Sequence, residues 1–210
     1  MKILVTGSAG FIDSNLAIRL SDRGDDVVST DNHNDYYDPK LKEARLSRHE
    51  NHPNYKHLRM DIRDKELVES LFEESDFDAV INLAAQAGVR YSIENPRAYL
   101  ESNLVGTFEL LEAARSFQPS HMLLASTSSV YGSNVSMPYK ESQKADHQMS
   151  FYAATKKSNE LMAYTYSHLY NMPVTGLRFF TVYGPYGREE AVLARFNRFN
   201  TVSYTHLRAH

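Results

Sequence analysis

Tyr152 and Lys156 are the two residues whose types and spacing point most directly to chemistry. They lie four apart in the segment YAATK, and this spacing places a phenol and an ammonium group on one face of a helix. A phenol is a poor base at neutral pH, but a neighbouring cation stabilises its phenolate and lowers its pKa. The pair alone would fit an exposed helix face, so its interpretation depends on the residues around it.

Two glycines near the N-terminus, Gly7 and Gly10, form a second candidate site. They follow the apolar residues ILV and precede Ile12 and Leu16, as in a strand, a tight turn and an amphipathic helix. Such a helix N-terminus offers free N–H groups to a pyrophosphate. Asp31, at the end of the next apolar stretch, would accept hydrogen bonds from a ribose 2′-hydroxyl and repel a 2′-phosphate, which favours NAD over NADP. Asp31 as a simple turn cap is the alternative.

A run of hydroxyl side chains strengthens the interpretation of Tyr152 and Lys156. The segment ASTSSVYG (125–132) has four hydroxyl residues in a row after an apolar stretch, namely Ser126, Thr127, Ser128 and Ser129. A hydroxyl, a tyrosine base and a lysine that follow a dinucleotide-binding turn indicate hydride transfer at a secondary alcohol.

The elements that must position these residues alternate between strand and helix. Apolar stretches predict strands at 2–6, 25–30, 57–62, 78–85, 121–126 and 173–180. The spacing of apolar residues predicts helices between these strands. One begins near Ile12, one covers KELVESLFEE, one contains Leu104, Phe108 and Leu111, and one extends from Tyr152 to Tyr170. This alternation predicts an α/β fold with a doubly wound parallel sheet of the Rossmann type. Asp61 and LAAQAG (83–88) would then lie at the carboxyl ends of strands, where ligands bind in such sheets.

Composition excludes several classes of function. The chain has 210 residues, a net charge of −3 and no cysteine. It has no basic stripe for nucleic acid, no apolar run long enough for a membrane span and no thiolate for a metal or a disulfide. We therefore expect a cytoplasmic protein without a metal site. Residues 191–210 lack a clean period and indicate an irregular tail, either frayed or foreign, such as an artefact of reading frame.

Five longer motifs reveal a family resemblance. They read DNHNDYYDPKLKEARL, NLAAQAGVRYS, SSVYG, YAATKKSNELMAYTYSHLY and LRFFTVYGPYGR. With them, residues 1–188 resemble the NAD-dependent epimerases and dehydratases of the extended short-chain dehydrogenase/reductase family, and among these the UDP-glucuronate 4-epimerases. The resemblance implies an NAD-binding domain over residues 1–190 that carries the catalytic residues. The family's smaller C-terminal substrate domain is largely missing from this chain.

The resemblance also implies a reaction, the 4-epimerisation of UDP-glucuronate to UDP-galacturonate. Tyr152 would deprotonate the sugar 4-hydroxyl while hydride passes from C4 to a tightly held NAD⁺, and the rotated 4-keto sugar would receive the hydride on its other face. Lys156 would bind the nicotinamide ribose and tune Tyr152, and Thr127 matches the catalytic serine or threonine. Arg188 is the candidate for the substrate carboxylate, because a guanidinium binds it in a bidentate fork. Arg188 as a solvated loop residue is the alternative, and Arg90 is a second candidate.

The expected contacts follow from the same motifs. For the cofactor they are Gly7, Gly10, Phe11, Ile12, Asp31, Asn32, Asp61, Ile62, Leu83, Ala84, Ala85, Gln86, Asn103, Ser126, Tyr152, Lys156 and Phe180. For the nucleotide-sugar substrate they are Arg90, Thr127, Ser128, Ser129, Thr181 and Arg188.

Other outcomes of the same chemistry stay open. The related 4,6-dehydratases carry Thr-Asp-Glu after this strand and the decarboxylases resemble TSEVYG, whereas this chain has Thr127, Ser128 and Ser129. The absence of those acidic groups favours epimerisation. A related epimerase, decarboxylase or dehydratase remains an alternative, as does an inactive truncated fragment that acts at most as an NAD-binding module. The helices at Leu104–Leu111 and Tyr152–Tyr170 are candidates for a homodimer contact.

Asp13 departs from the family's glycine pattern, which has a third glycine at this position. A carboxylate in the first turn of a helix gains about 0.3–1 kcal/mol from the helix dipole. Its repulsion of a phosphate about 6 Å away costs roughly 1–3 kcal/mol at intermediate screening. We therefore expect Asp13 to weaken NAD binding by about one to two powers of ten without abolishing it.

Overall fold

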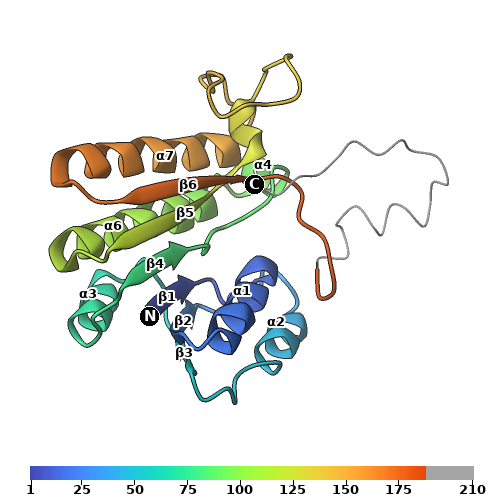
Figure 1. Ribbon diagram of the computed structural model, residues 1–210. Coiled ribbons are helices and arrows are strands. Elements are labelled where there is room, and N and C mark those ends of the chain that lie inside the picture. The colour runs from blue at the N-terminus through green and yellow to red at the C-terminus, as the bar shows by residue number, and fades with distance from the viewer. Residues whose placement is uncertain (188–210) are drawn as a thin grey trace.

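The computed structural model describes residues 1–187 of the chain. Within this part, six parallel strands form one sheet in the order β3-β2-β1-β4-β5-β6, which confirms the predicted doubly wound sheet (Figure 1). The strands are β1 (Lys2–Thr6), β2 (Asp26–Asp31), β3 (Tyr55–Arg59), β4 (Ala79–Asn82), β5 (His121–Thr127) and β6 (Val174–Phe179).

Helices connect the strands and cover both faces of the sheet. They are α1 (Phe11–Asp22), α2 (Pro39–Leu46), α3 (Lys65–Glu73), α4 (Tyr91–Glu94), α5 (Pro96–Tyr99), the π-helix η1 (Leu100–Val105), α6 (Gly106–Phe117), the 3-10 helix η2 (Ser128–Tyr131) and α7 (Phe151–Tyr170). Figure 1 shows α1 and α2 beside β1–β3, and α6 and α7 running along β5 and β6.

Strand residues alternate between two apolar cores. Leu4 points into the core that α3, α6 and α7 cover, together with Val80 and Met122 of neighbouring strands. Ile3 and Val5 point into the other core, which Ala17 and Leu20 of α1 cover. Because successive side chains of a strand face opposite sides, a central strand with a helix layer on each face must be apolar throughout. This explains why the residues ILV precede the glycine turn.

Three strands differ from their predicted form. β3 ends at Arg59, so Asp61 lies beyond the strand, and β4 ends at Asn82, so residues 83–88 form a loop. β6 was expected to be a buried strand, but its residues are half-buried or exposed because it lies at the edge of the sheet. The expected irregular segment 191–210 lies outside the described residues.

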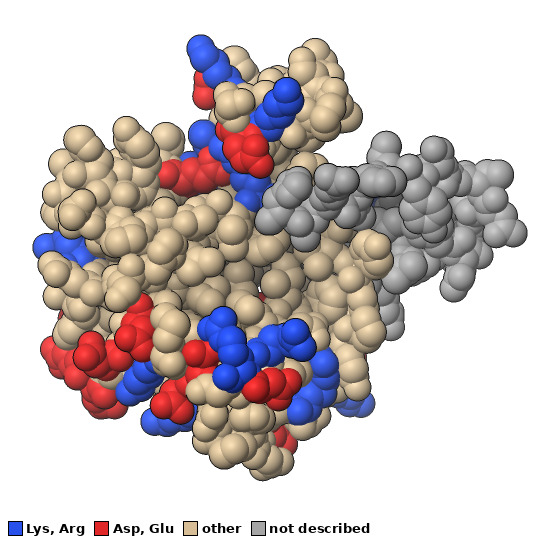
Figure 2. Space-filling model, viewed as in Figure 1, with Lys and Arg blue, Asp and Glu red and all other residues tan. Residues whose placement is uncertain are grey.

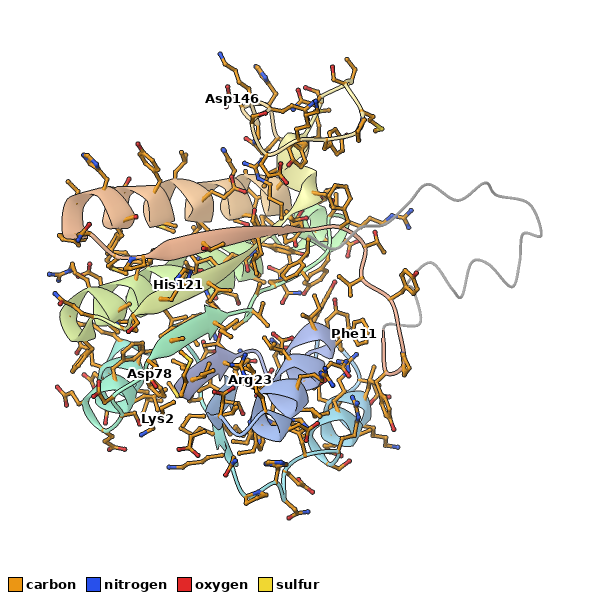
Figure 3. The ribbon with its side chains drawn as sticks, in the orientation of Figure 1. Lys2, Phe11, Arg23, Asp78, His121 and Asp146 are labelled. Carbon is orange, nitrogen blue, oxygen red and sulfur yellow. The ribbon has the colours of Figure 1, made fainter. Side chains whose placement is uncertain are left out.

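The order of the strands determines where a ligand can bind. β1 has β2 on one side and β4 on the other, so the chain reverses its direction across the sheet between them. Ligands of open parallel sheets bind at the carboxyl ends of the strands beside such a reversal. Figure 3 shows Lys2, Asp78 and His121 toward one end of the strands and Phe11 toward the other, the carboxyl end.

On the face that Figure 2 shows, lysine and arginine lie among aspartate and glutamate over the lower part of the molecule. A broad uncharged area separates these side chains from the loop between η2 and α7, which protrudes at the top. No helix within residues 1–187 is long and apolar enough to cross a membrane. The described residues also contain no group of three or more histidine or acidic side chains suited to a metal ion.

Candidate functional site

A cavity of about 460 Å³ opens at the carboxyl ends of the strands. Tyr152, Lys156 and Thr127 line it together with Gly7 and Gly10, so the two candidate sites of the sequence form one site. Its lining also includes these residues expected from the sequence: Phe11, Ile12, Asp31, Asn32, Asp61, Ile62, Leu83, Ala84, Ala85, Gln86, Ser126, Ser128, Ser129, Phe180 and Thr181.

The glycine turn brings the backbone close to the cavity. Gly7 has a φ of 83°, in the left-handed region that glycine adopts without strain. A Cβ on Gly7 would lie 2.9 Å from the Cα of Ala84, so the turn also packs tightly on the loop after β4. The N–H of Gly10 donates to the carbonyl of Gly7 at 2.7 Å, which closes the turn. Helix α1 begins here without a side-chain cap, and its first N–H groups suit an anion.

Asp31 lies at the end of β2, where the sequence placed it. Its carboxylate accepts a hydrogen bond from the backbone N–H of Ala9 at 3.2 Å, which connects β2 to the glycine turn. Lys42 of α2 forms an ion pair with Asp31 at 3.5 Å, and both side chains are buried. The buried pair holds one carboxylate oxygen toward the turn, and this arrangement fits a ribose whose hydroxyls need an acceptor and a donor.

Asp61 has a fixed position in the cofactor half of the cavity. It accepts hydrogen bonds from Arg63 and from the side-chain amide of Asn32, the latter at 2.9 Å. Burial acts to raise the pKa of Asp61, but the bonds from Arg63 and Asn32 outweigh burial and lower it. Asp61 is therefore ionised and rigidly held.

Asp13 is the feature that does not fit a dinucleotide turn. Its side chain is 7% exposed, and its Oδ2 lies 2.1 Å from where a Cβ on Gly10 would stand. The carboxylate thus occupies the space that the third glycine of the motif would leave open. Its Oδ1 has no hydrogen-bond partner among the described residues. The turn, the helix N-terminus and Asp31 fit NAD, and Asp13 is the exception among the residues lining this part of the cavity.

The catalytic candidates lie at the β5 end of the cavity. Lys156 is buried, and its Nζ donates to the carbonyl of Ala125 at 2.8 Å. Burial lowers the pKa of Lys156 to about 8, although the charge of Asp13 acts to raise it. Thr127 caps η2 by accepting from the N–H of Ser129 at 3.2 Å. The Tyr152 ring meets Tyr99 edge-on, with the ring centroids 5.9 Å apart. The helix α7 therefore presents both Tyr152 and Lys156 to the cavity, as their spacing predicted.

A charged cluster behind β5 supports this end of the site. Ser126 donates to Glu160 at 2.6 Å, and Arg178 of β6 binds both carboxylate oxygens of Glu160. Burial acts to raise the pKa of Glu160, but the hydrogen bonds from Arg178, Ser126 and Lys157 lower it to about 2. Glu160 therefore joins α7 to β5 and β6 as a carboxylate that is charged at neutral pH.

Asn103 does not line the cavity, and its expected contact with the cofactor stays a prediction. Its side chain is completely buried, and its amide both donates to the carbonyl of Gln86 and accepts from the N–H of Gln86. It also donates to Thr155 of α7 at 3.0 Å. Asn103 therefore positions the loop after β4 beneath the cavity wall.

The structure describes only one of the two arginines expected at the substrate. Arg90 is exposed at the start of α4 and does not line the cavity, and its contact with the substrate stays a prediction. Arg188 lies outside the described residues, and its role stays a prediction.

Sequence reasoning missed the contribution of α2 to the cavity. Lys42 and Arg45 both line it, and Arg45 is only 1% exposed. Arg45 donates to the carbonyl of Ala9 in the glycine turn and, through two nitrogens, to the carbonyl of Tyr186. The sequence feature that could have revealed this contribution is the spacing of three between Lys42 and Arg45 within DNHNDYYDPKLKEARL. This spacing puts the two side chains on one face of a helix.

The segment after β6 is connected to the glycine turn through Arg45, which donates to both. Figure 1 shows it running from the end of β6 toward α1 and α2. A Cβ on Gly184 would lie 3.3 Å from the Phe11 ring, and Arg48 lies over the Tyr186 ring at 4.7 Å from its centroid. Residues 184–187 therefore pack beside the start of α1, the part of the site that faces an anion.

Comparisons with known proteins place this site in a family. A family model described as GDP-mannose 4,6 dehydratase matches residues 4–203. "Protein CapI" of Staphylococcus aureus is 52% identical over 198 residues, which are 94% of this chain and 59% of that protein. The "Probable UDP-glucuronate 4-epimerase" of Rhizobium meliloti (strain 1021) is 48% identical over 93% of this chain and 58% of its own length. The chain thus spans less than two thirds of these relatives.

The fold is also similar to solved structures. The UDP-glucuronic acid 4-epimerase from Bacillus cereus, solved in complex with UDP-glucuronic acid and NAD, matches with a TM-score of 0.85 and 34% identity. The match covers 93% of this chain and 62% of that protein.

Proposed function

The chain belongs to the GDP-mannose 4,6 dehydratase family, and from this premise we propose that the protein is an NAD-dependent 4-epimerase of a nucleotide sugar, with UDP-glucuronate as its substrate. The observation that carries the proposal is the meeting of the glycine turn with Thr127, Tyr152 and Lys156 in one cavity. Relatives at 48% identity and the fold of the Bacillus cereus enzyme support the choice of substrate.

Cofactor binding would use the β1, β2 and β4 side of the cavity. The uncapped start of α1 and the glycine turn would hold the pyrophosphate, and Asp31 with Lys42 would bind the adenosine ribose. The small side chains Ala84 and Ala85 would let the backbone approach the nicotinamide half. When bound there, NAD would supply the hydride acceptor and donor of the reaction.

Proton transfer would use the β5 end of the cavity. The Tyr152 phenolic oxygen would take the proton of the sugar 4-hydroxyl and later return it. The Lys156 ammonium, buried on the same helix face, would stabilise the phenolate. The hydroxyl of Thr127, held in place by the N–H of Ser129, would hydrogen-bond the same sugar oxygen.

The charges of the cavity favour epimerisation over elimination. A dehydratase needs an additional acid and base beside the sugar. Among the described residues, the carboxylates that line the cavity are Asp13, Asp31 and Asp61, and each lies on the cofactor side. Ser128 and Ser129 occupy the places beside Thr127 where acidic groups would be needed.

The carboxylate of a uronate sugar would need a fixed position. Once C4 is a ketone, such a sugar is a β-keto acid that loses carbon dioxide when the carboxylate lies perpendicular to the carbonyl plane. We propose that Thr181 and Arg188, with the Ser128 and Ser129 hydroxyls, would hold the carboxylate out of that orientation.

A second candidate function is an NAD-binding module without turnover. The chain spans 59% and 58% of the two curated relatives named above, and Phe180 is 45% exposed at the substrate end of the cavity. The cofactor end is better enclosed, with Asp13, Lys42 and Arg45 all buried. This difference in enclosure supports cofactor binding as the activity of this second candidate.

One experiment distinguishes the two candidates. The purified protein is assayed for bound NAD after denaturation, and its conversion of UDP-glucuronate is followed by chromatography. An epimerase yields UDP-galacturonate, and Tyr152→Phe is expected to reduce kcat by 10²–10⁴-fold while leaving bound NAD unchanged. Bound NAD without turnover supports the module. A pentose product or a dehydrated sugar contradicts epimerisation, and the absence of NAD binding under all conditions contradicts both candidates.

A further inference from the structure

The side chain of Asp13 lies against the glycine turn that would hold the pyrophosphate of NAD. Asp13 is the third residue of α1 and lines the cavity. Its Oδ1 lies 3.1 Å from where a Cβ on Gly7 would stand, and its Oδ2 lies close to the same point on Gly10. The carboxylate therefore covers the two glycines whose missing side chains open the turn to an anion.

The surroundings of Asp13 disfavour its charge. Burial raises the pKa of Asp13 to about 8, and the charge of Asp31 on β2 acts in the same direction. The hydrogen bond to the backbone N–H of Asp13, and then the charges of Arg45 on α2 and Lys156 on α7, act to lower this pKa but do not outweigh burial. Oδ1 is also buried without a hydrogen-bond partner among the described residues, so an ionised carboxylate would be poorly solvated there.

A pyrophosphate would strengthen this preference. Its two negative charges would face a second anion in a site shielded from water, where like charges repel strongly. A neutral carboxyl would instead donate its O–H to a phosphate oxygen, a charge-assisted hydrogen bond.

We propose that Asp13 binds the NAD pyrophosphate as an uncharged carboxylic acid, so that NAD binding is coupled to the protonation of Asp13. The inference rests on the NAD site of the proposed function and adds a pH dependence that a glycine at this position would not produce. The proton comes from solvent when NAD binds at a pH where Asp13 is ionised, and it returns to solvent when NAD leaves.

Lys156 complicates the pH dependence and requires a matched control. Its pKa is also about 8, so the loss of its ammonium would weaken NAD binding over the same range. Asp13→Asn keeps Lys156 and replaces the acid with an amide of nearly the same shape that cannot ionise. Because the Asp13 charge acts to raise the Lys156 pKa, Asp13→Asn loses the Lys156 ammonium at a lower pH than wild type. A steeper pH dependence of wild type therefore still reports Asp13, and Asp13→Gly restores the open turn.

The test is calorimetric titration of the nucleotide-free chain with NAD from pH 6.5 to pH 9. Each pH is measured in two buffers of different ionisation enthalpy, which counts the protons taken up. Between pH 7 and pH 9 we expect the Kd of wild type to rise about tenfold more than that of Asp13→Asn. At pH 8.5 wild type is expected to take up more protons per NAD than Asp13→Asn, approaching one additional proton.

Two results would overturn the inference while leaving NAD binding intact. One is an equal pH dependence and proton count for wild type and Asp13→Asn. The other is binding by Asp13→Gly together with no binding by wild type at pH 6.5, since a protonated Asp13 would then exclude the cofactor. If none of the three chains binds NAD at any pH while circular dichroism shows them folded, the proposed function itself fails and the inference fails with it.

Discussion

At the scale of single residues, the buried Asp13 carboxyl affects stability as well as ligand binding. Its pKa is raised from 3.8 to about 8, so between these values the folded chain holds a proton that the unfolded chain releases. Stability must therefore fall as pH rises through this range. Asp13→Asn cannot ionise and is expected to be more stable than wild type at pH 8.5. This advantage should shrink by roughly 3 kcal/mol at pH 5.5, because one pKa unit corresponds to about 1.4 kcal/mol.

Urea denaturation at the two pH values measures this difference. Asp26→Asn is the control, because Asp26 is exposed at the start of β2, and its effect should not change between these pH values. An advantage of Asp13→Asn that is equal at both pH values would show that Asp13 does not titrate in this range.

Single residues also show the limit of inference from the sequence. Tyr152, Lys156 and Asp31 could be assigned because spacing and strand ends determine where their side chains lie. Lys42 and Arg45 could not, because a polar helix that carries Lys40, Lys42 and Arg45 has the composition of a solvated surface. Their burial depends on Asp31 and on the carbonyl of Tyr186, which lies 141 residues away from Arg45.

At the scale of elements, Glu160 fixes α7 against β5 and β6. Its contacts with Ser126 and Arg178 hold the helix that carries Tyr152 and Lys156. Glu160→Gln removes the charge that Arg178 requires and is expected to lower the free energy of unfolding by roughly 1–3 kcal/mol at pH 7. The loss should fade as pH falls below 4.5 toward about 2, because protonation removes the same charge from wild type.

Chemical denaturation of Glu160→Gln beside Glu69→Gln tests this role. Glu69 forms an exposed ion pair with Lys65 on α3 at 3.6 Å, so its loss should cost less than about 0.5 kcal/mol. Equal effects of the two substitutions would mean that Glu160 does not fix the helix.

The strands and α7 could be predicted from the sequence better than η1, because the packing of η1 depends on long-range contacts. The apolar strands and the long helix α7 were recognisable from periodicity. The π-helix η1 was not, because its irregular turn serves to place the Asn103 amide against the backbone of Gln86, a long-range contact. The spacing of Leu104, Phe108 and Leu111 correctly marked a helix, and Leu111 is buried in the core, but Phe108 is 43% exposed. Leu110, which that spacing does not include, is also buried.

At the scale of the whole molecule, the cavity is lined by parts of the chain that are far apart in the sequence. The glycine turn, the loops after β2 and β4, and α7 all contribute to its lining. A ligand that binds only the folded chain stabilises it by mass action, by about 2.7 kcal/mol at 100 times its Kd. Saturating NAD is therefore expected to raise the Tm by roughly 5–10 °C for a chain of this size.

Thermal unfolding with NADP at the same concentration is the control for this prediction. The additional 2′-phosphate would meet the Asp31 carboxylate, so a smaller rise in Tm is expected. An equal rise with NADP would contradict the role of Asp31, and a Tm unchanged by NAD at every pH would contradict cofactor binding.

The pairing of β1 with β4 also has a consequence for how the chain acquires its structure. Thr6 and Asn82, which pair across these strands, are 76 residues apart. Contacts of such separation form slowly, because a long loop must be closed before they can stabilise anything. We therefore expect β1 to keep one edge of unpaired N–H and C=O groups during synthesis until β4 has left the ribosome. This interval is when the growing chain is most open to association with other unpaired strands.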